Sequence, residues 1–251
     1  MQINFYGITD TGKKRNNNED AFVAEQLDES AVLAVVIDGV GGYEGGEVAA
    51  EIAQKEIPAY LKEFNNGERL EQLKRAVVSA NNTIFERRQV DYTKANMCCV
   101  LTAVIIDTKQ QFVYMAHVGD TRFYQFHNSF LDKLSHDHSL VGYMEDIGVL
   151  SEEQAMHHPK RNEIRRCVGS ERHDVDDYNF IEAEQFPLLQ NSTYLLCSDG
   201  LTDLVTSGQI RNIIQQNIPI KDMAQNLITA ANDAGGKDNI TTVIVDYKAQ
   251  Q

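Results

Sequence analysis

Three short apolar segments that each end in an aspartate constrain this sequence most. They are rich in β-branched or small residues and stand next to glycine, which predicts buried strands that leave the core at the carboxylate. Three further carboxylates, in two segments, stand just before predicted strands. The carboxylates are Asp38, Asp120 and Asp199 at the strand exits, and Glu19, Asp20 and Asp238 at the strand entries. The fold therefore has to place six acidic side chains at sheet edges rather than on solvated helix faces.

The remaining pattern predicts one α+β domain over residues 1–251. Strands are expected at residues 3–8, 21–25, 31–37, 98–106, 111–118, 122–127, 178–184, 193–197 and 240–247. Two long helices are expected between the third and fourth strands, with further helices near 207–216 and 221–233. The strands come in blocks, which favours antiparallel sheets covered by helices. Residues 142–159 are less periodic and are expected to form a mobile flap.

Charge and composition exclude several classes of protein. The formal net charge is −14, which argues against nucleic acid and anionic membranes as partners. No apolar run is long enough for a transmembrane helix, and no secretory signal is recognisable. The four cysteines show no CxxC spacing and include an adjacent pair in an apolar run, which favours buried thiols in a reducing cytoplasm.

Several carboxylates at one end of a core repel one another and are costly to desolvate. A divalent cation resolves that conflict, and ligands that are all oxygen favour Mg²⁺ or Mn²⁺ over Zn²⁺. Taken singly, Asp38-Gly39 and Asp199-Gly200 are typical of ordinary turns, and Asp120 is placed to pair with Arg122. Arg15 lies close in sequence to two of the carboxylates, and a guanidinium can hold a phosphate by two bonds. Together these residues suggest phosphoryl chemistry.

With these segments assembled, the chain resembles the metal-dependent protein phosphatases (PPM, or type 2C), in a compact bacterial form. The matching segments are RNNNEDAF (15–22), VVIDGVGGYEGGEVAA (35–50), VGDTRFY (118–124), HDHSL (136–140), NEIRRCVG (162–169), LLCSDGLTD (195–203) and GGKDNITTVIV (235–245). They follow the order of the family, and the resemblance spans about residues 3–248. It implies a central sandwich of two antiparallel β-sheets flanked by antiparallel helices.

The resemblance also implies a role for each matching residue. Asp38 would bridge two ions of Mn²⁺ or Mg²⁺, the Gly39 carbonyl would bind one of them, and Asp199 and Asp238 would bind the other. Glu19 and Asp20 would hydrogen-bond the waters of these ions. The remaining implied roles are Arg15 on the substrate phosphate, Asp120 at a weaker third ion, and Asn239 as a support for the Asp238 loop.

The implied reaction is in-line attack by a metal-bridging hydroxide on phosphoserine or phosphothreonine, without a phospho-enzyme. The partners would be phosphorylated proteins and a serine/threonine kinase that the enzyme opposes, and the protein would be a monomer. Two alternatives stay open from the sequence: a catalytically silent phosphoprotein-binding module, and a phosphatase of small phosphate esters. The implied metal-ligand positions are all intact, which argues against the silent binding module. The sequence of the flap does not reveal which substrates it would select, so the second alternative stays open.

Two positions depart from the family pattern. Val40 stands where many eukaryotic relatives have a histidine that protonates the leaving group, so we expect the rate to depend more strongly on leaving-group acidity. Met97-Cys98-Cys99-Val100 replaces a run of small residues before the fourth strand, which we interpret as a change in core packing. His136 and His138 flank Asp137 but are not expected to bind a metal, because neighbouring loop side chains rarely converge on one ion.

Overall fold

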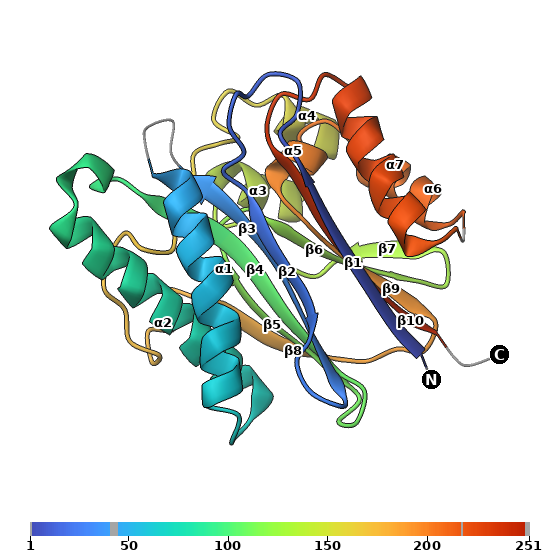
Figure 1. Ribbon diagram of the computed structural model, residues 1–251. Coiled ribbons are helices and arrows are strands. Elements are labelled where there is room, and N and C mark those ends of the chain that lie inside the picture. Colours follow the sequence, from blue (N-terminus) through green and yellow to red (C-terminus); the bar gives the residue numbers. More distant parts are fainter. Residues whose placement is uncertain (1, 41–44, 217, 249–251) are drawn as a thin grey trace.

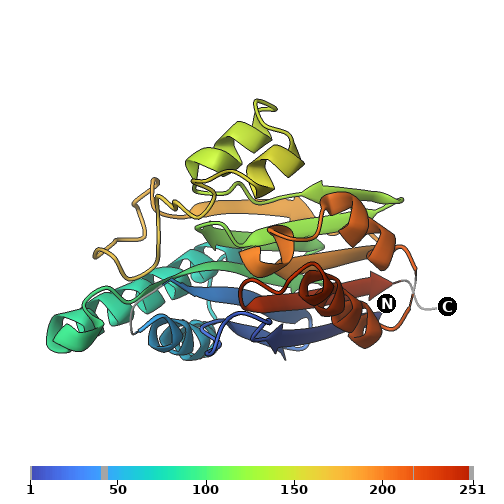
Figure 2. The same cartoon turned by 90° about the horizontal axis from the view of Figure 1, so that it is seen from above.

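A computed structural model describes residues 2–40, 45–216 and 218–248. Residues 41–44 of the motif at 35–50 lie outside the described residues. Two five-stranded antiparallel sheets lie face to face between layers of helices, as Figures 1 and 2 show. The predicted antiparallel α+β sandwich is confirmed.

The two sheets differ in strand order. The first runs β1 (Gln2–Asp10), β10 (Ile240–Lys248), β9 (Ser192–Cys197), β6 (Arg122–His127) and β7 (Phe130–Lys133). The second runs β2 (Ala21–Gln26), β3 (Ala31–Val40), β4 (Cys98–Asp107), β5 (Phe112–Val118) and β8 (Glu182–Pro187). All neighbouring strands pair in antiparallel register, including β1 with β10, which are the first and last strands described.

Each outer sheet face is covered by its own helices. Helices α1 (Gly46–Glu63) and α2 (Arg69–Val90) cover the second sheet, and α5 (Asp199–Thr202), α6 (Ser207–Ile214) and α7 (Ile220–Asp233) cover the first. Helices α3 (Leu140–Asp146) and α4 (Glu152–Met156) stand apart from these layers in Figure 2. A short 3₁₀ helix, Tyr92–Lys94, leads from α2 toward β4.

Strand β3 explains why the predicted strands have continuous apolar runs. Leu33, Val35 and Ile37 pack with α1 and α2, whereas Val32 and Val36 pack against the other sheet. All five are fully buried, so both faces of the strand need apolar side chains. Burying each such side chain contributes about 1.5–3 kcal/mol, which holds the sheet rigid up to the position of Asp38.

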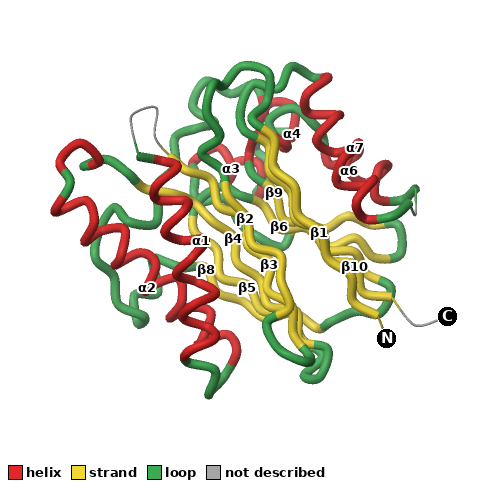
Figure 3. Tube along the Cα trace, viewed as in Figure 1, coloured by secondary structure: helices red, strands yellow, loops and turns green. Residues whose placement is uncertain are grey.

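Three sequence predictions differ from the structure. The strand predicted at 178–184 is displaced to β8, and Tyr178 is 86% exposed. Strand β7 was not predicted, because its alternating sequence is short and half-exposed. The stretch at 142–159, expected to be irregular, contains most of α3 and all of α4; the tube in Figure 3 shows both as helix. Side chains of Ser139 and Ser151 cap these helices, a local signal that periodicity does not detect.

Candidate metal centre

A cleft of about 210 Å³ lies where the ends of β3, β5 and β9 meet the entry of β10. Its lining includes five of the six predicted carboxylates together with the predicted phosphate-binding arginine and the supporting asparagine. These residues are Arg15, Glu19, Asp38, Gly39, Asp120, Asp199, Asp238 and Asn239. The structure thus brings together side chains from segments more than 200 residues apart in the chain.

The sixth predicted carboxylate, Asp20, is fixed by two hydroxyl groups behind this cleft. Ser198 Oγ donates to Asp20 Oδ2 at 2.8 Å, and Thr241 Oγ1 donates to the same oxygen at 2.7 Å. Ser198 precedes Asp199 and its main chain pairs with Thr241, so the two donors come from neighbouring strands. This arrangement orients Asp20 relative to Asp199.

Asn239 joins the N-terminal loop to the entry of β10. Its side-chain oxygen accepts a hydrogen bond from Glu19 N at 2.8 Å, and its Nδ2 donates to the carbonyls of Thr11 and Asn17 at 3.0 and 2.9 Å. The side chain is buried and uses its oxygen and its amide group in these bonds. It therefore positions the loop that carries Arg15 and Glu19 as well as the adjacent Asp238.

Gly39 allows the backbone after Asp38 to come very close to α1. A Cβ atom at this position would lie 2.5 Å from the Gly46 carbonyl oxygen and 2.6 Å from the Glu19 carbonyl oxygen. Gly39 N donates to the Glu19 carbonyl at 3.2 Å. No residue with a side chain fits here without moving the strand end, so Gly39 is required by close backbone approach.

Crowding of acidic groups dominates the electrostatics of the cleft. Desolvation raises the pKa of Asp38 and of Asp199 well above the usual value, and the neighbouring carboxylates raise both further. Desolvation also raises the pKa of Asp20 and of Asp120 to about 7, against the lowering effect of the two hydroxyls in the case of Asp20. The protein itself therefore leaves these charges poorly compensated.

Arg15 is the only basic side chain among the described residues that line the cleft. Its Nη2 donates to Asp238 Oδ2 at 2.7 Å, which is the main reason that the pKa of Arg15 is raised. One partly exposed guanidinium does not neutralise this many carboxylates. Because the potential ligands are carboxylates, the set fits hard divalent cations such as Mn²⁺ and Mg²⁺.

Two buried histidines hold Gly119, the residue before Asp120. His117 Nε2 lies 2.9 Å from the Gly119 carbonyl oxygen, and the His138 ring accepts from Gly119 N at 3.1 Å. Gly119 has a φ of +112°, so its unusual backbone conformation is held from both sides. Burial lowers the pKa of His138 to about 3, which keeps this ring neutral.

These histidines and Glu182 form a group whose potential ligand atoms lie within 4.8 Å of one another. Both ring nitrogens of His117 are already engaged, with Thr102 Oγ1 at 2.9 Å and with Gly119. His136 forms an ion pair with Glu182 at 2.7 Å, away from the carboxylate cleft.

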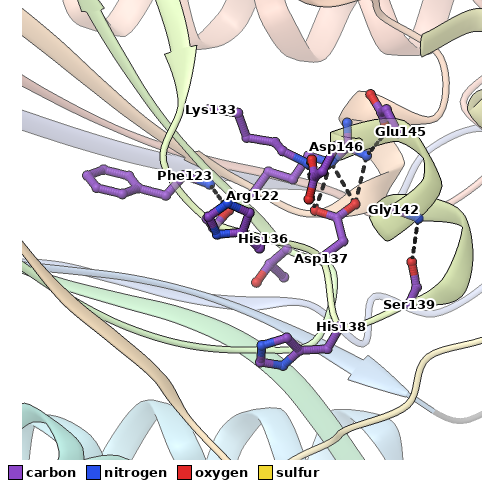
Figure 4. A network of polar contacts seen from close by, with 12 residues as sticks. Arg122, Phe123, Lys133, His136, Asp137, His138, Ser139, Gly142, Glu145 and Asp146 are labelled. Atoms are coloured by element: carbon purple, nitrogen blue, oxygen red, sulfur yellow. Dashed lines mark hydrogen bonds and ion pairs between the residues drawn. The ribbon is translucent and has the colours of Figure 1, made fainter. Parts of the chain in front are cut away.

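A network of ion pairs beside the cleft was not predicted, and Figure 4 shows it. The Arg122 guanidinium donates to Asp137 Oδ2 and to Glu145 Oε2, both at 2.7 Å, and Lys133 lies 3.4 Å from Asp137 and 2.6 Å from Asp146. Burial would raise the pKa of Asp137, but the charges of Arg122 and Lys133 outweigh it and lower that pKa. The network connects β6 and β7 to α3.

Asp203 is a further acidic residue that the sequence analysis missed. It lies one helical turn after Asp199, and that spacing was the available signal. Desolvation raises its pKa, although Arg161 Nε donates to it at 2.5 Å. Asp120, Asp199, Asp203 and Arg161 line a second small cavity next to the main cleft.

The fold and the acidic cleft together define a type 2C phosphatase, and residues 11–242 match the family described as Protein phosphatase 2C. The chain belongs to this family of serine/threonine phosphatases.

Relatives extend the likeness over nearly the whole chain. The serine/threonine phosphatase stp of Listeria innocua is 34% identical over 250 residues, which cover 97% of this chain and 95% of that protein. The structure of Stp1 from Staphylococcus aureus has a TM-score of 0.89 and 26% identity, with 99% and 96% coverage. The catalytic domain of PstP in complex with two manganese ions has a TM-score of 0.82 and 28% identity, with 98% and 99% coverage.

The described helices include none that is both long enough and apolar enough to cross a membrane.

Proposed function

We propose that the protein removes phosphate from phosphoserine and phosphothreonine with two divalent cations bound in the carboxylate cleft. Asp38, Gly39, Asp199 and Asp238 would hold the ions, and Asp120 would contribute to a weaker third site. The observation that carries this proposal is the raised pKa of Asp38 and Asp199 in a cleft with one basic residue. The relative solved with two manganese ions supports the choice of metal.

When bound, the ions would supply an acidified water and neutralise charge on the phosphoryl oxygens. Arg15 would bind the phosphate by two parallel hydrogen bonds. A cation held by Asp238 would compete with Arg15 for Oδ2, which would leave the guanidinium more available for substrate. Glu19 and Asp20 would orient water, because Ser198 and Thr241 fix Asp20 in one position.

Phosphoproteins are the substrate class that the family and the relatives named serine/threonine phosphatase support. The enzyme would act as a monomer and would reverse the work of a serine/threonine kinase. All four cysteines are free thiols, which supports placing the protein in the reducing cytoplasm.

The test compares hydrolysis of p-nitrophenyl phosphate and of a phosphothreonine peptide, each with Mn²⁺ and with EDTA. We expect activity only with metal, and a loss of about 10³-fold in Asp199→Asn, equivalent to about 4 kcal/mol in the barrier. Asp132→Asn is the matched control, because Asp132 is exposed on β7. Metal-independent turnover, or full activity in Asp199→Asn, would overturn the proposal. Hydrolysis of the ester but of no phosphopeptide would point instead to small phosphate esters.

A further inference from the structure

Cys98 and Cys167 bring two free thiols together outside the carboxylate cleft. Cys98 begins β4, and Cys167 lies in the segment between α4 and β8. Cys99 and Val168, the residues next to them, pair their backbones through two hydrogen bonds of 3.1 and 2.7 Å. Cys98 Sγ donates to the Val40 carbonyl at 3.9 Å, and the thiols of Cys98 and Cys167 are close enough for each to shift the pKa of the other. Residues 69 positions apart in the sequence are thus held side by side.

The two cysteines differ in access to solvent. Cys167 is partly exposed and lines a cavity of about 170 Å³ together with Arg165, Arg166 and Ser170. Cys98 is 8% exposed and lies behind it. The remaining cysteines, Cys99 and Cys197, are fully buried, so a small oxidant from solvent reaches Cys167 first.

The surroundings favour the thiolate of Cys167 over that of Cys98. The hydrogen bond from Cys98 lowers the pKa of Cys167 to about 7, helped by Ser170 and the charge of Arg88 and opposed by burial and Glu171. Arg88 is fixed nearby, because it donates to the carbonyls of Ala95 and Gly169 at 2.7 and 2.6 Å. The same hydrogen bond, together with burial, raises the pKa of Cys98. A thiolate with a second thiol nearby is the arrangement of an oxidisable pair.

We propose that Cys98 and Cys167 form a modification site that peroxides oxidise to an intramolecular disulfide. The Cys167 thiolate attacks the peroxide, its S–O bond forms as the O–O bond breaks, and the alkoxide or hydroxide that leaves takes up a proton. Cys98 then attacks the sulfenic sulfur, the S–S bond forms, and the sulfenic oxygen leaves as water with the Cys98 proton. Two electrons pass from the two thiols to the peroxide.

The closed loop would contain β4, β5, β6, β7, α3, α4 and Asp120. Oxidation would therefore attach the segment that follows the flap covalently to the start of β4. This site is independent of the proposed phosphatase reaction, and its test needs no substrate.

The test treats the folded protein with hydrogen peroxide in EDTA and measures intact mass and non-reduced peptide maps. We expect a loss of about 2 Da, a single Cys98–Cys167 cross-link, reversal by dithiothreitol, and reduced Cys99 and Cys197. In Cys98→Ser, dimedone should trap a sulfenic acid on Cys167. In Cys167→Ser, Cys98 should stay reduced. Oxidation of Cys167 without a cross-link in the wild-type protein, or a cross-link through Cys99 or between two molecules, would overturn the proposal.

A matched pair of variants tests the hydrogen bond itself. Cys98→Ser keeps a donor to Cys167, whereas Cys98→Ala removes it. We expect the rate of Cys167 oxidation near neutral pH to fall several-fold in Cys98→Ala relative to Cys98→Ser, because the thiolate fraction falls. Equal rates in two variants with the same circular dichroism and melting temperature would contradict this role of Cys98.

Discussion

Asp120 and Arg122 are separated by one residue, yet they belong to two groups of charges with opposite character. The ion-pair network around Arg122 balances each buried carboxylate with a protein cation, and the pKa of Asp137 is lowered. In the carboxylate cleft, repulsion and desolvation raise the pKa of Asp38 and Asp199. The first group is balanced by cations of the chain itself, whereas the second has more carboxylates than the one arginine beside it can balance.

The two groups of charges should differ most in how the loss of one carboxylate changes the free energy of unfolding. Asp137→Asn leaves the Arg122 guanidinium without its main partner, so we expect a loss of about 3–5 kcal/mol in the free energy of unfolding. Asp199→Asn relieves repulsion in the metal-free protein, so its free energy of unfolding should rise. Urea unfolding in EDTA measures both. A loss of stability in Asp199→Asn of similar size to that in Asp137→Asn would remove the distinction.

Added metal should stabilise the wild-type protein through the cleft alone. Mn²⁺ at about 100 times its Kd raises the free energy of unfolding by about 2.7 kcal/mol, because it binds only the folded state. Thermal unfolding with and without Mn²⁺ measures the shift. In Asp38→Asn the shift should be lost, whereas Glu145→Gln in the ion-pair network should keep it. Equal shifts in all three proteins would place the metal elsewhere.

The two groups should also respond differently to pH. The pKa of Asp20 and of Asp120 is raised from 3.8 to about 7, mainly by burial, so the folded metal-free protein binds their protons more tightly than the unfolded chain. Their stabilising contribution is full below the unfolded pKa and is lost as the pH rises through about 7. We expect the metal-free protein to be more stable at about pH 6 than at about pH 8 by about 1 kcal/mol, after allowance for solvent screening.

The contribution of Asp137 to stability should change with pH in the opposite direction. Its lowered pKa gives stability that is present above its unfolded pKa and is lost only in acid, as the pH falls through the folded pKa. Unfolding experiments in EDTA across the pH range therefore should show a maximum on the acid side of neutrality. A rise in stability from about pH 6 to about pH 8 would contradict the raised pKa values in the cleft.

The smallest expected effect concerns the link from the ion-pair network to α3. Glu145→Gln keeps a hydrogen-bond acceptor for Arg122 but removes its charge, so the loss in the free energy of unfolding should be about 1 kcal/mol. Asp132→Asn, on exposed β7, should change stability by less. A loss as large as that of Asp137→Asn would mean that Glu145, rather than Asp137, is the main partner of Arg122.

Buried runs with clear ends predicted antiparallel sheets covered by helices, and the resemblance to the type 2C phosphatases implied that two such sheets form a sandwich. Asp38, Asp120 and Asp199 were found for the same reason, since each follows such a run. The displaced β8 shows the limit: an edge strand with half-exposed side chains carries little hydrophobic signal. Helices α3 and α4 were missed because each has fewer than eight residues and depends on serine caps.

Long-range polar partners were the part that the sequence did not reveal. Asp137 stands between two histidines, and nothing local indicates that Arg122, 15 residues away, is its partner. Ser198 and Thr241 likewise become partners of Asp20 only when β9 and β10 pair. Such contacts depend on how the strands are arranged in space. The order of residues within one helix or strand therefore does not predict them.

The pairing of β1 with β10 has a consequence for the newly made chain. Residues 2–10 leave the ribosome long before residues 240–248, which are their strand partner. Asn239 is made at the same stage, and its hydrogen bonds position the loop that carries Arg15 and Glu19. A chain translated only as far as β9 therefore lacks both Asp238 and the anchor of the loop that carries Arg15, so we expect no catalytic activity before β10 has been made.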